Sequence, residues 1–219
     1  MQKSYLFFII AYKIKYFGDV TGMKKTISIA LSILMIMLCF SGCSGTKMTE
    51  ENVKKTVDKA FTALCEFDTK NLRKYVDSKT LSTIIGYAEK QEQFQSLGKA
   101  IFSGLEYEIK SIDLENQTVT VSVKNKSLYQ TAYEFARELK SNYSTFQLLT
   151  KLSDETFLNT YLTELCNDIE NAPSASESVD ITLGITQGKK NLVLSFDSAS
   201  EDTVSGGALS AIKYIYGIN

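Results

Sequence analysis

The chain has 219 residues, of which 44% are hydrophobic and 11% aromatic, a composition typical of a globular protein. Its 24 basic and 25 acidic residues nearly cancel, so we expect no positive field for nucleic acid. The chain has no histidine, the commonest general base and the commonest zinc ligand. We therefore expect no nucleic-acid partner, no metal and no other cofactor.

The amino-terminal part of the chain has the pattern of a secretion signal. Lys24 and Lys25 precede an uncharged apolar run over residues 26–40. A helix of that length spans only about 22 Å, whereas a membrane core is about 30 Å thick. We therefore predict a cleaved signal peptide at residues 23–42. The alternative is an uncleaved helix that crosses the membrane.

Residues 1–22 fit no part of such a signal. We predict that this start is mis-annotated and that translation begins at Met23, because the two lysines then form a normal basic start. The alternative is a genuine apolar patch over residues 5–12 that lies on the membrane.

The residues Phe40, Ser41, Gly42 and Cys43 resemble the lipobox of bacterial lipoproteins, although leucine is usual where Phe40 stands. In that motif a signal peptidase cuts before the cysteine, whose thiol then carries diacylglycerol. The resemblance implies lipidation of Cys43, a tether over residues 43–49, and a location on the outer face of the cell membrane.

Cys65 and Cys166 are the two other cysteines of the mature chain, because Cys39 leaves with the signal. Outside the cell they can form one disulfide. Alternatively, each is a free thiol that packs on an apolar helix face, since Phe61 and Leu162 each lie four residues before one of them.

Residues 50–219 show the periodicities of a single α+β domain. We expect a helix capped by Thr49, a short helix from Asp68, and a third helical region from Ser78 or Thr80 to Gly104. An alternating strand follows over residues 105–114, and its parity changes near Ser111, which predicts a β-bulge.

The remaining elements also follow the apolar spacing. The valines at 119, 121 and 123 predict the second strand of a hairpin, and residues 179–185 and 192–196 predict another hairpin. Between the hairpins we expect a two-helix insertion over residues 125–176, which ends in a loop at Pro173. Asp202 is expected to cap a final helix.

This order resembles the NTF2-like (cystatin-like) superfamily, and specifically the small lipoproteins of unknown function of Gram-positive bacteria. The resemblance rests on the motif at Cys43, the helical start over residues 61–75, the valine-rich hairpin, and Gly206-Gly207 in the last helix. It implies a curved antiparallel sheet packed on the N-terminal helices as a half-open cone, with the insertion near its mouth. The superfamily contains isomerases, dehydratases, hydrolases and binding modules, so it selects no function.

Two short motifs resemble catalytic sequences but are incomplete. Ser96 and Lys99 match the S-x-x-K of penicillin-binding enzymes without the partner motifs, so we interpret them as a solvated helix end. The stretch from Gly184 through Gly188 to Lys190 has the wrong spacing for a phosphate-binding loop, and we interpret it as a hairpin turn.

Carboxylates are the only acid–base groups with plausible roles, but their pattern favours solvated or capping positions. Glu106 and Glu108 share one strand face opposite the apolar residues. Asp197, Glu201 and Asp202 precede the last helix but lack the pattern of a calcium loop. We therefore assign no catalytic residue and no metal ligand.

The tyrosines are the best candidates for lining a ligand site, because each combines apolar area with a hydroxyl group. The candidates are Tyr107, Tyr129, Tyr133, Tyr143 and Tyr161. The alternative is ordinary packing with hydroxyls at the edge.

We therefore expect a lipid-anchored module that binds a small ligand or an envelope protein. The alternatives are an NTF2-like isomerase or hydrolase, with a carboxylate and tyrosines in its cone, and an envelope spacer without a ligand.

Overall fold

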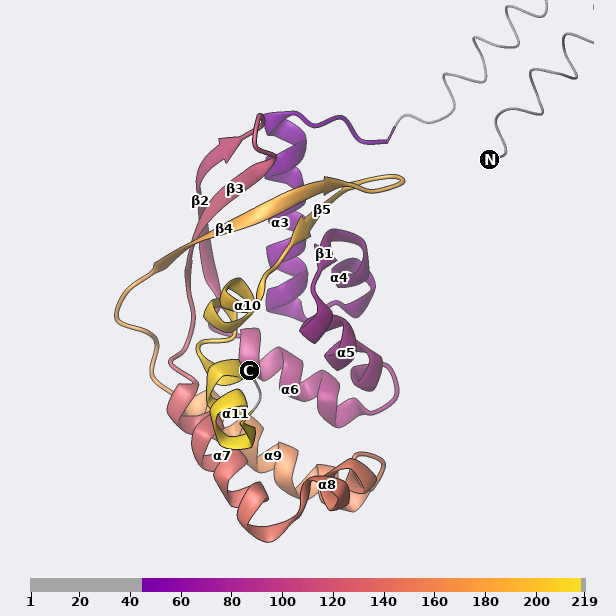
Figure 1. The fold of residues 1–219 in the computed structure, drawn as a ribbon, viewed down its shortest axis with the longest axis vertical. Coiled ribbons are helices and arrows are strands. Elements are labelled where there is room, and N and C mark those ends of the chain that lie inside the picture. Colours follow the sequence, from indigo (N-terminus) through magenta and orange to yellow (C-terminus); the bar gives the residue numbers. More distant parts are fainter. Residues whose placement is uncertain (1–44, 218–219) are drawn as a thin grey trace, which may run out of the picture. The chain divides into compact units, whose positions relative to one another are not determined.

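In a computed structural model of the protein, the structure describes residues 45–217, which belong to the compact unit Gly45–Asn219 (Figure 1). The predictions for the chain start, the signal peptide and the lipidation of Cys43 concern residues outside this range. Within the described range, no helix combines the length and apolar character needed to cross a membrane.

A curved five-stranded sheet with the order β1-β5-β4-β3-β2 forms one side of the unit and confirms a mixed α+β fold. The two predicted hairpins are β2 (Glu106–Asp113) with β3 (Thr118–Lys124), and β4 (Val179–Gln187) with β5 (Leu192–Ser195). The sequence did not predict β1 (Val76–Asp77), a two-residue strand that pairs with β5 in parallel.

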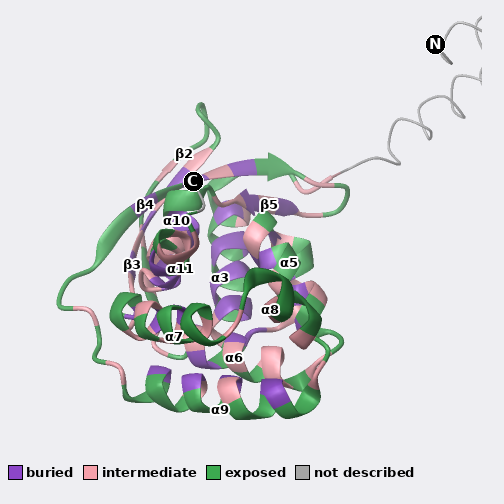
Figure 2. Cartoon of the chain, turned by 60° about the horizontal axis from the view of Figure 1, so that its bottom comes forward, coloured by how far each residue is buried: buried purple, intermediate pink, exposed green. Residues whose placement is uncertain are grey.

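Helix α3 (Glu50–Glu66) packs against the sheet, and Thr49 caps it as predicted by accepting a hydrogen bond from the Asn52 backbone N–H. Val53, Val57 and Phe61 lie on its buried face, at the three- and four-residue steps of an amphipathic helix. Figure 2 shows buried segments, in purple, along α3. The buried valines of β3 alternate with its half-exposed residues, so one face of that strand belongs to the same apolar cluster as α3.

The bulge predicted near Ser111 is present. The register of β2 against β3 shifts between Ile109 and Ser111, so Lys110 has no partner in the ladder. The extra residue moves Tyr107, Ile109 and Ile112 onto the same side of a bent strand, where all three pack against the core.

The third helical region is two helices instead of one. Asp68 caps α4 (Thr69–Tyr75) as expected, and Ser78 caps α5 (Lys79–Ala88). The backbone of Gln91 is extended and interrupts the helical path, and α6 (Glu92–Phe102) begins directly after it.

The insertion contains three helices where two were expected: α7 (Tyr129–Asn142), α8 (Thr145–Lys151) and α9 (Glu155–Asn171). The long helical pattern is interrupted because Ser144 and Gln147 form a capping box that starts α8, and Asp154 caps α9. The insertion begins and ends near its predicted bounds. Its two ends meet there, because the Ser127 N–H donates to the Pro173 carbonyl.

The C-terminal segment also divides, into α10 (Ser198–Val204) and α11 (Ala208–Tyr216). Gly206 and Gly207 lie between these helices, not within the last helix as expected. Gly206 has a φ of +65°, and a Cβ there would lie 2.1 Å from the Lys126 carbonyl oxygen, so only glycine fits.

Asp202 caps the last helix in an unexpected way. It lies inside α10, whose own N-cap is Asp197. Its carboxylate reaches across to α11 and accepts hydrogen bonds from the backbone N–H and the hydroxyl of Ser210, both at 2.7 Å. The sequence predicted that Asp202 caps the last helix, but not that it does so from within α10, the preceding helix.

Part of the expected tether is docked on the sheet. The Thr46 hydroxyl donates to the Lys190 carbonyl at 2.8 Å, and the Gln187 side-chain amide donates to the Thr46 carbonyl at 2.9 Å. Residues 45–49 therefore run along the β4–β5 hairpin, and Met48 packs against the core.

Two apolar clusters stabilise the unit. The sheet cluster lies between the sheet and α3–α5, and includes Phe61, Phe67, Leu72, Leu183, Leu192 and Leu194. The helical cluster is built by α6, α7, α9 and α11, and its buried residues are Ala100, Leu128, Ala132, Phe157, Leu158, Leu162, Leu165, Ile169, Ala208 and Ala211.

Candidate functional site

The helical cluster encloses a pocket of about 280 Å³, which we call the apolar pocket. Helices α6, α7, α9 and α11, the middle of α8 and the residue after α8 contribute to its walls. Every lining side chain is apolar: Phe94, Leu97, Ile101, Leu128, Ala132, Phe135, Leu139, Leu148, Leu152, Phe157, Leu158, Leu162, Leu165, Ile169 and Ile212.

The spacing of apolar residues in α9 builds the largest part of this wall. Leu158, Leu162, Leu165 and Ile169 recur at steps of four, three and four residues, so they share one face of the helix and are buried. On the opposite side, the small Ala132 of α7 leaves space where a larger side chain would fill the pocket. Residues of the insertion thus supply much of the pocket wall, together with residues of α6 and α11.

Helix α8 closes one side of the pocket, and none of its residues is fully buried. Leu148 lines the pocket, as does Leu152 directly after the helix. Phe146 and Leu149 point outward and are 76% and 61% exposed. The helix is therefore held by few apolar contacts, and its local stability should be low.

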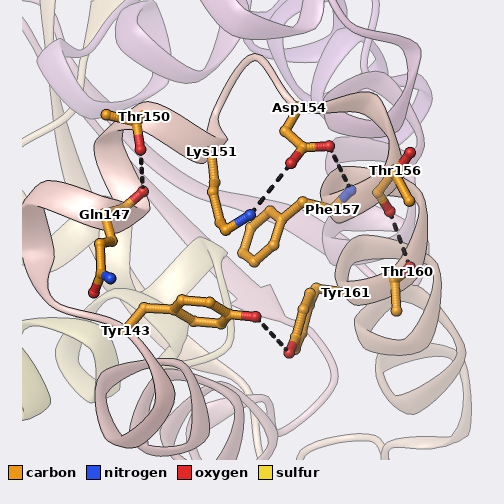
Figure 3. Close-up of polar contacts among 9 residues, drawn as sticks. All are labelled: Tyr143, Gln147, Thr150, Lys151, Asp154, Thr156, Phe157, Thr160 and Tyr161. Atoms are coloured by element: carbon orange, nitrogen blue, oxygen red, sulfur yellow. Dashed lines mark hydrogen bonds and ion pairs between the residues drawn. The ribbon is translucent and has the colours of Figure 1, made fainter.

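The rim beside Phe157 is polar and aromatic (Figure 3). The Lys151 ammonium lies 3.2 Å from the Asp154 carboxylate, and also faces the rings of Phe157 and Tyr143, at 5.1 and 5.7 Å from their centroids. The hydroxyls of Tyr143 and Tyr161 share a hydrogen bond of 3.2 Å.

Two groups on this rim have shifted pKa values. The backbone N–H of Phe157, followed by the Lys151 ammonium, lowers the pKa of Asp154. The hydrogen bond with Tyr143 raises the pKa of Tyr161, and so do burial and the negative charges of Glu138 and Glu164. At neutral pH the rim therefore presents an ionised Asp154 carboxylate and a neutral Tyr161 phenol.

The five tyrosines of the sequence prediction occupy three places, and none of them lines the apolar pocket. Tyr143 and Tyr161 lie on its rim, in contact with Phe157. Tyr129 and Tyr133 stack on each other along α7, with ring centroids 6.4 Å apart.

Tyr107 lies apart from the other four, in the sheet cluster. Its ring stacks on Phe61 at 4.6 Å, and its hydroxyl donates to the Asp58 carboxylate at 3.3 Å. Burial and the charge of Asp58 raise its pKa. Tyr107 is therefore a packing residue, and the predicted site divides between the sheet and the insertion.

The sequence pattern favoured a solvated or capping position for Glu201 on α10, but it is the most buried carboxylate of the described residues. It is 9% exposed and accepts hydrogen bonds from the hydroxyls of Ser78, at 2.5 Å, and Thr80, at 2.6 Å. It borders a narrow space of about 50 Å³ between the sheet and α5–α6. The available signal in the sequence was the pair of hydroxyls at the start of α5, because buried hydroxyl donors need an acceptor.

The incomplete motifs have structural roles, but their positions differ in part from the prediction, since Ser96 lies in the middle of α6 and Gly184 lies in β4, before the turn. Ser96 and Lys99 lie exposed on α6, and the Gly188 N–H closes the β4–β5 turn by donating to the Asn191 carbonyl at 2.8 Å. Glu106 and Glu108 are exposed, and Glu108 pairs with Lys110. Residues 45–217 contain no group of three or more acidic or cysteine side chains arranged to hold a metal ion.

Cys65 and Cys166 are free thiols in the structure and belong to different clusters, so the pairing considered from the sequence is not formed. The Cys65 thiol donates to the Leu105 carbonyl, whereas Cys166 packs on α9. Burial raises the pKa of both thiols, which keeps them protonated at neutral pH.

In comparisons with known proteins, no family model, no curated protein and no solved structure matched the chain. The NTF2-like resemblance therefore stays a prediction, and the site must be interpreted from its own geometry.

Proposed function

We propose that this protein is a lipid-anchored module on the outer face of the cell membrane, which binds a small apolar ligand in its helical layer. The anchor in this proposal is Cys43, at the end of the lipobox-like motif. The sheet and α3 serve as the scaffold, in the manner of an NTF2-like cone, and the insertion supplies the binding element.

The apolar pocket carries the proposal. A pocket of about 280 Å³ approaches the size of small-molecule sites, and a ligand there would gain free energy by leaving water. Its walls present no acid, base or nucleophile. Such a lining supports binding, not catalysis.

The NTF2-like enzyme alternative requires a carboxylate that is open to substrate inside the cone, between the sheet and the helices. Among residues 45–217, Glu201 is the only carboxylate that lines the space there, but hydroxyl groups occupy both of its oxygens. A space of about 50 Å³ also accommodates only one or two water molecules. Glu201 therefore supports a structural role.

The anchor is tested by metabolic labelling of the full chain with an alkyne-tagged fatty acid. We expect label on the wild-type protein and none on Cys43→Ser, whereas Cys39→Ser is the matched control and should keep the label. Labelling of Cys43→Ser, or no labelling of the wild type, would contradict lipid anchoring.

Ligand binding is tested separately on residues 45–219, which form the compact unit. Decanol is a suitable neutral probe, and binding should raise the midpoint of thermal unfolding as its concentration rises. A midpoint that does not change with decanol, together with no heat in calorimetry, would contradict the binding function.

A further inference from the structure

The apolar pocket adjoins a second, polar depression, which we call the acidic groove. It lies between α7 and α9 and has a volume of about 810 Å³. Phe135 lines both spaces, and Tyr161, which lines the groove, stacks on Phe157 of the pocket at 4.6 Å. The two spaces therefore share an aromatic wall.

The groove has an excess of negative charge. Four carboxylates line it, from Glu134 and Glu138 on α7 and from Glu164 and Asp168 on α9, against the single cation Arg137. Within the described residues, none of these carboxylates forms an ion pair. The Arg137 guanidinium instead faces the Tyr133 ring at 5.8 Å.

The aromatic rim already accommodates an ammonium group. The Lys151 ammonium lies over the faces of Phe157 and Tyr143, at distances typical of cation–π contacts. On the groove side, the aromatic rings of Phe135 and Tyr161 lie beside the four carboxylates, a combination that a quaternary ammonium group prefers.

The volume of the pocket limits the length of an apolar tail. An engineered cavity of about 150 Å³ holds one benzene molecule, which is about 25 Å³ per carbon. At that density, a pocket of about 280 Å³ holds a tail of about ten carbons.

From this juxtaposition we infer that the protein binds a cationic amphiphile, with one aliphatic tail of about ten carbons in the apolar pocket and its ammonium head in the acidic groove. This inference rests on the proposed function and adds the chemical class of the ligand. The tail gains by burial, and the head gains by proximity to the carboxylates and the aromatic wall.

The first test is a chain-length series of alkyltrimethylammonium ions, measured by calorimetry on residues 45–219 below the micelle concentration. Each added methylene should tighten the Kd about threefold to fourfold, until the tail reaches about ten carbons. Affinity should then level off, because the pocket is full. No dependence on chain length, or a continued rise to sixteen carbons, would contradict the tail assignment.

The second test compares ten-carbon ligands with different heads. Decyltrimethylammonium should bind about tenfold more tightly than decanol, and decyl sulfate more weakly than decanol. High salt should reduce these differences. Equal binding of all three would overturn the inference and leave the proposed function standing, whereas no binding of any would contradict both.

Variants separate the two parts of the site. Leu165→Phe should fill the pocket and weaken all three ligands at least tenfold, while Leu149→Phe, on the exposed side of α8, should not. The double variant Glu138→Gln and Glu164→Gln should remove the preference for the cation. The control double variant Glu106→Gln and Glu115→Gln, which makes the same change in charge on the β2–β3 hairpin, should keep it. Circular dichroism checks that each variant is folded. An unchanged preference for the cation in the Glu138→Gln and Glu164→Gln double variant would refute the head assignment.

Discussion

The sheet cluster and the helical cluster are built from similar apolar residues but are packed to different degrees. In the sheet cluster, Phe61, Leu183 and Leu194 are completely buried, and α3 fills the space against the strands. In the helical cluster, Phe157, Leu162 and Leu165 keep 7–8% exposure around a space of about 280 Å³. One half of the unit therefore holds the fold together, whereas the other leaves a space that the proposed ligand would fill.

The largest expected effect is in the sheet cluster. Phe61→Ala should lower the free energy of unfolding by about 3–5 kcal/mol, because it removes a fully buried ring and leaves a cavity. Phe146→Ala makes the same change on α8, where the ring is 76% exposed, and should cost no more than about 0.5 kcal/mol. Urea unfolding of both variants measures the difference, and equal costs would contradict the comparison.

The buried carboxylate of α10 should have the next largest effect. Glu201→Gln removes the charge that accepts the Ser78 and Thr80 hydroxyls, and should cost about 1.5–3 kcal/mol in urea unfolding. Glu108→Gln, which breaks only an exposed pair, should cost less than about 1 kcal/mol. A Glu201→Gln variant as stable as the wild type would show that this contact does not hold α10 against α5.

Backbone dynamics should separate the two regions without any substitution. Amide hydrogens of α8 should exchange by local opening, because that helix has no buried residue, while those of α3 should exchange near the global limit. Hydrogen-exchange mass spectrometry provides the comparison. Equal protection of the two helices would argue against α8 as a loosely held wall.

The smallest effect is a pH dependence at the rim. The pKa of Asp154 is lower in the folded protein than its ordinary value of 3.8, because the Phe157 N–H and the Lys151 ammonium favour the carboxylate. Its stabilisation is therefore complete above about pH 5 and is lost as the pH falls through the folded pKa. Asp154→Asn should flatten the loss of stability between pH 5 and pH 2, and an unchanged profile would contradict this contribution.

The sequence was informative where a pattern is local. The parity change near Ser111 predicted the bulge, and the side-chain oxygens of Thr49 and Asp68 predicted two helix starts. The break before α8 was also visible, as Ser144 followed by Gln147, but the surrounding apolar spacing masked it. The strand β1 has only two residues, too few for any periodicity to show.

The candidate site depended on packing between distant helices and was harder to predict. The sequence placed a pocket in the insertion, yet its lining comes from leucines and phenylalanines that look like ordinary core. Tyrosine spacing directed attention to Tyr107, which the fold places in the other cluster. The partners of Glu201 are more than 120 residues away in sequence, so no local pattern could reveal them.

The central claim is that the helical cluster, and not the sheet cluster, accepts an apolar guest. Methyl-labelled residues 45–219 titrated with decanol in nuclear magnetic resonance test it most directly. The account predicts chemical-shift changes at Leu162, Leu165 and Ile169, and none at Leu183 or Leu194. Unchanged spectra, or equal changes in both clusters, would contradict it.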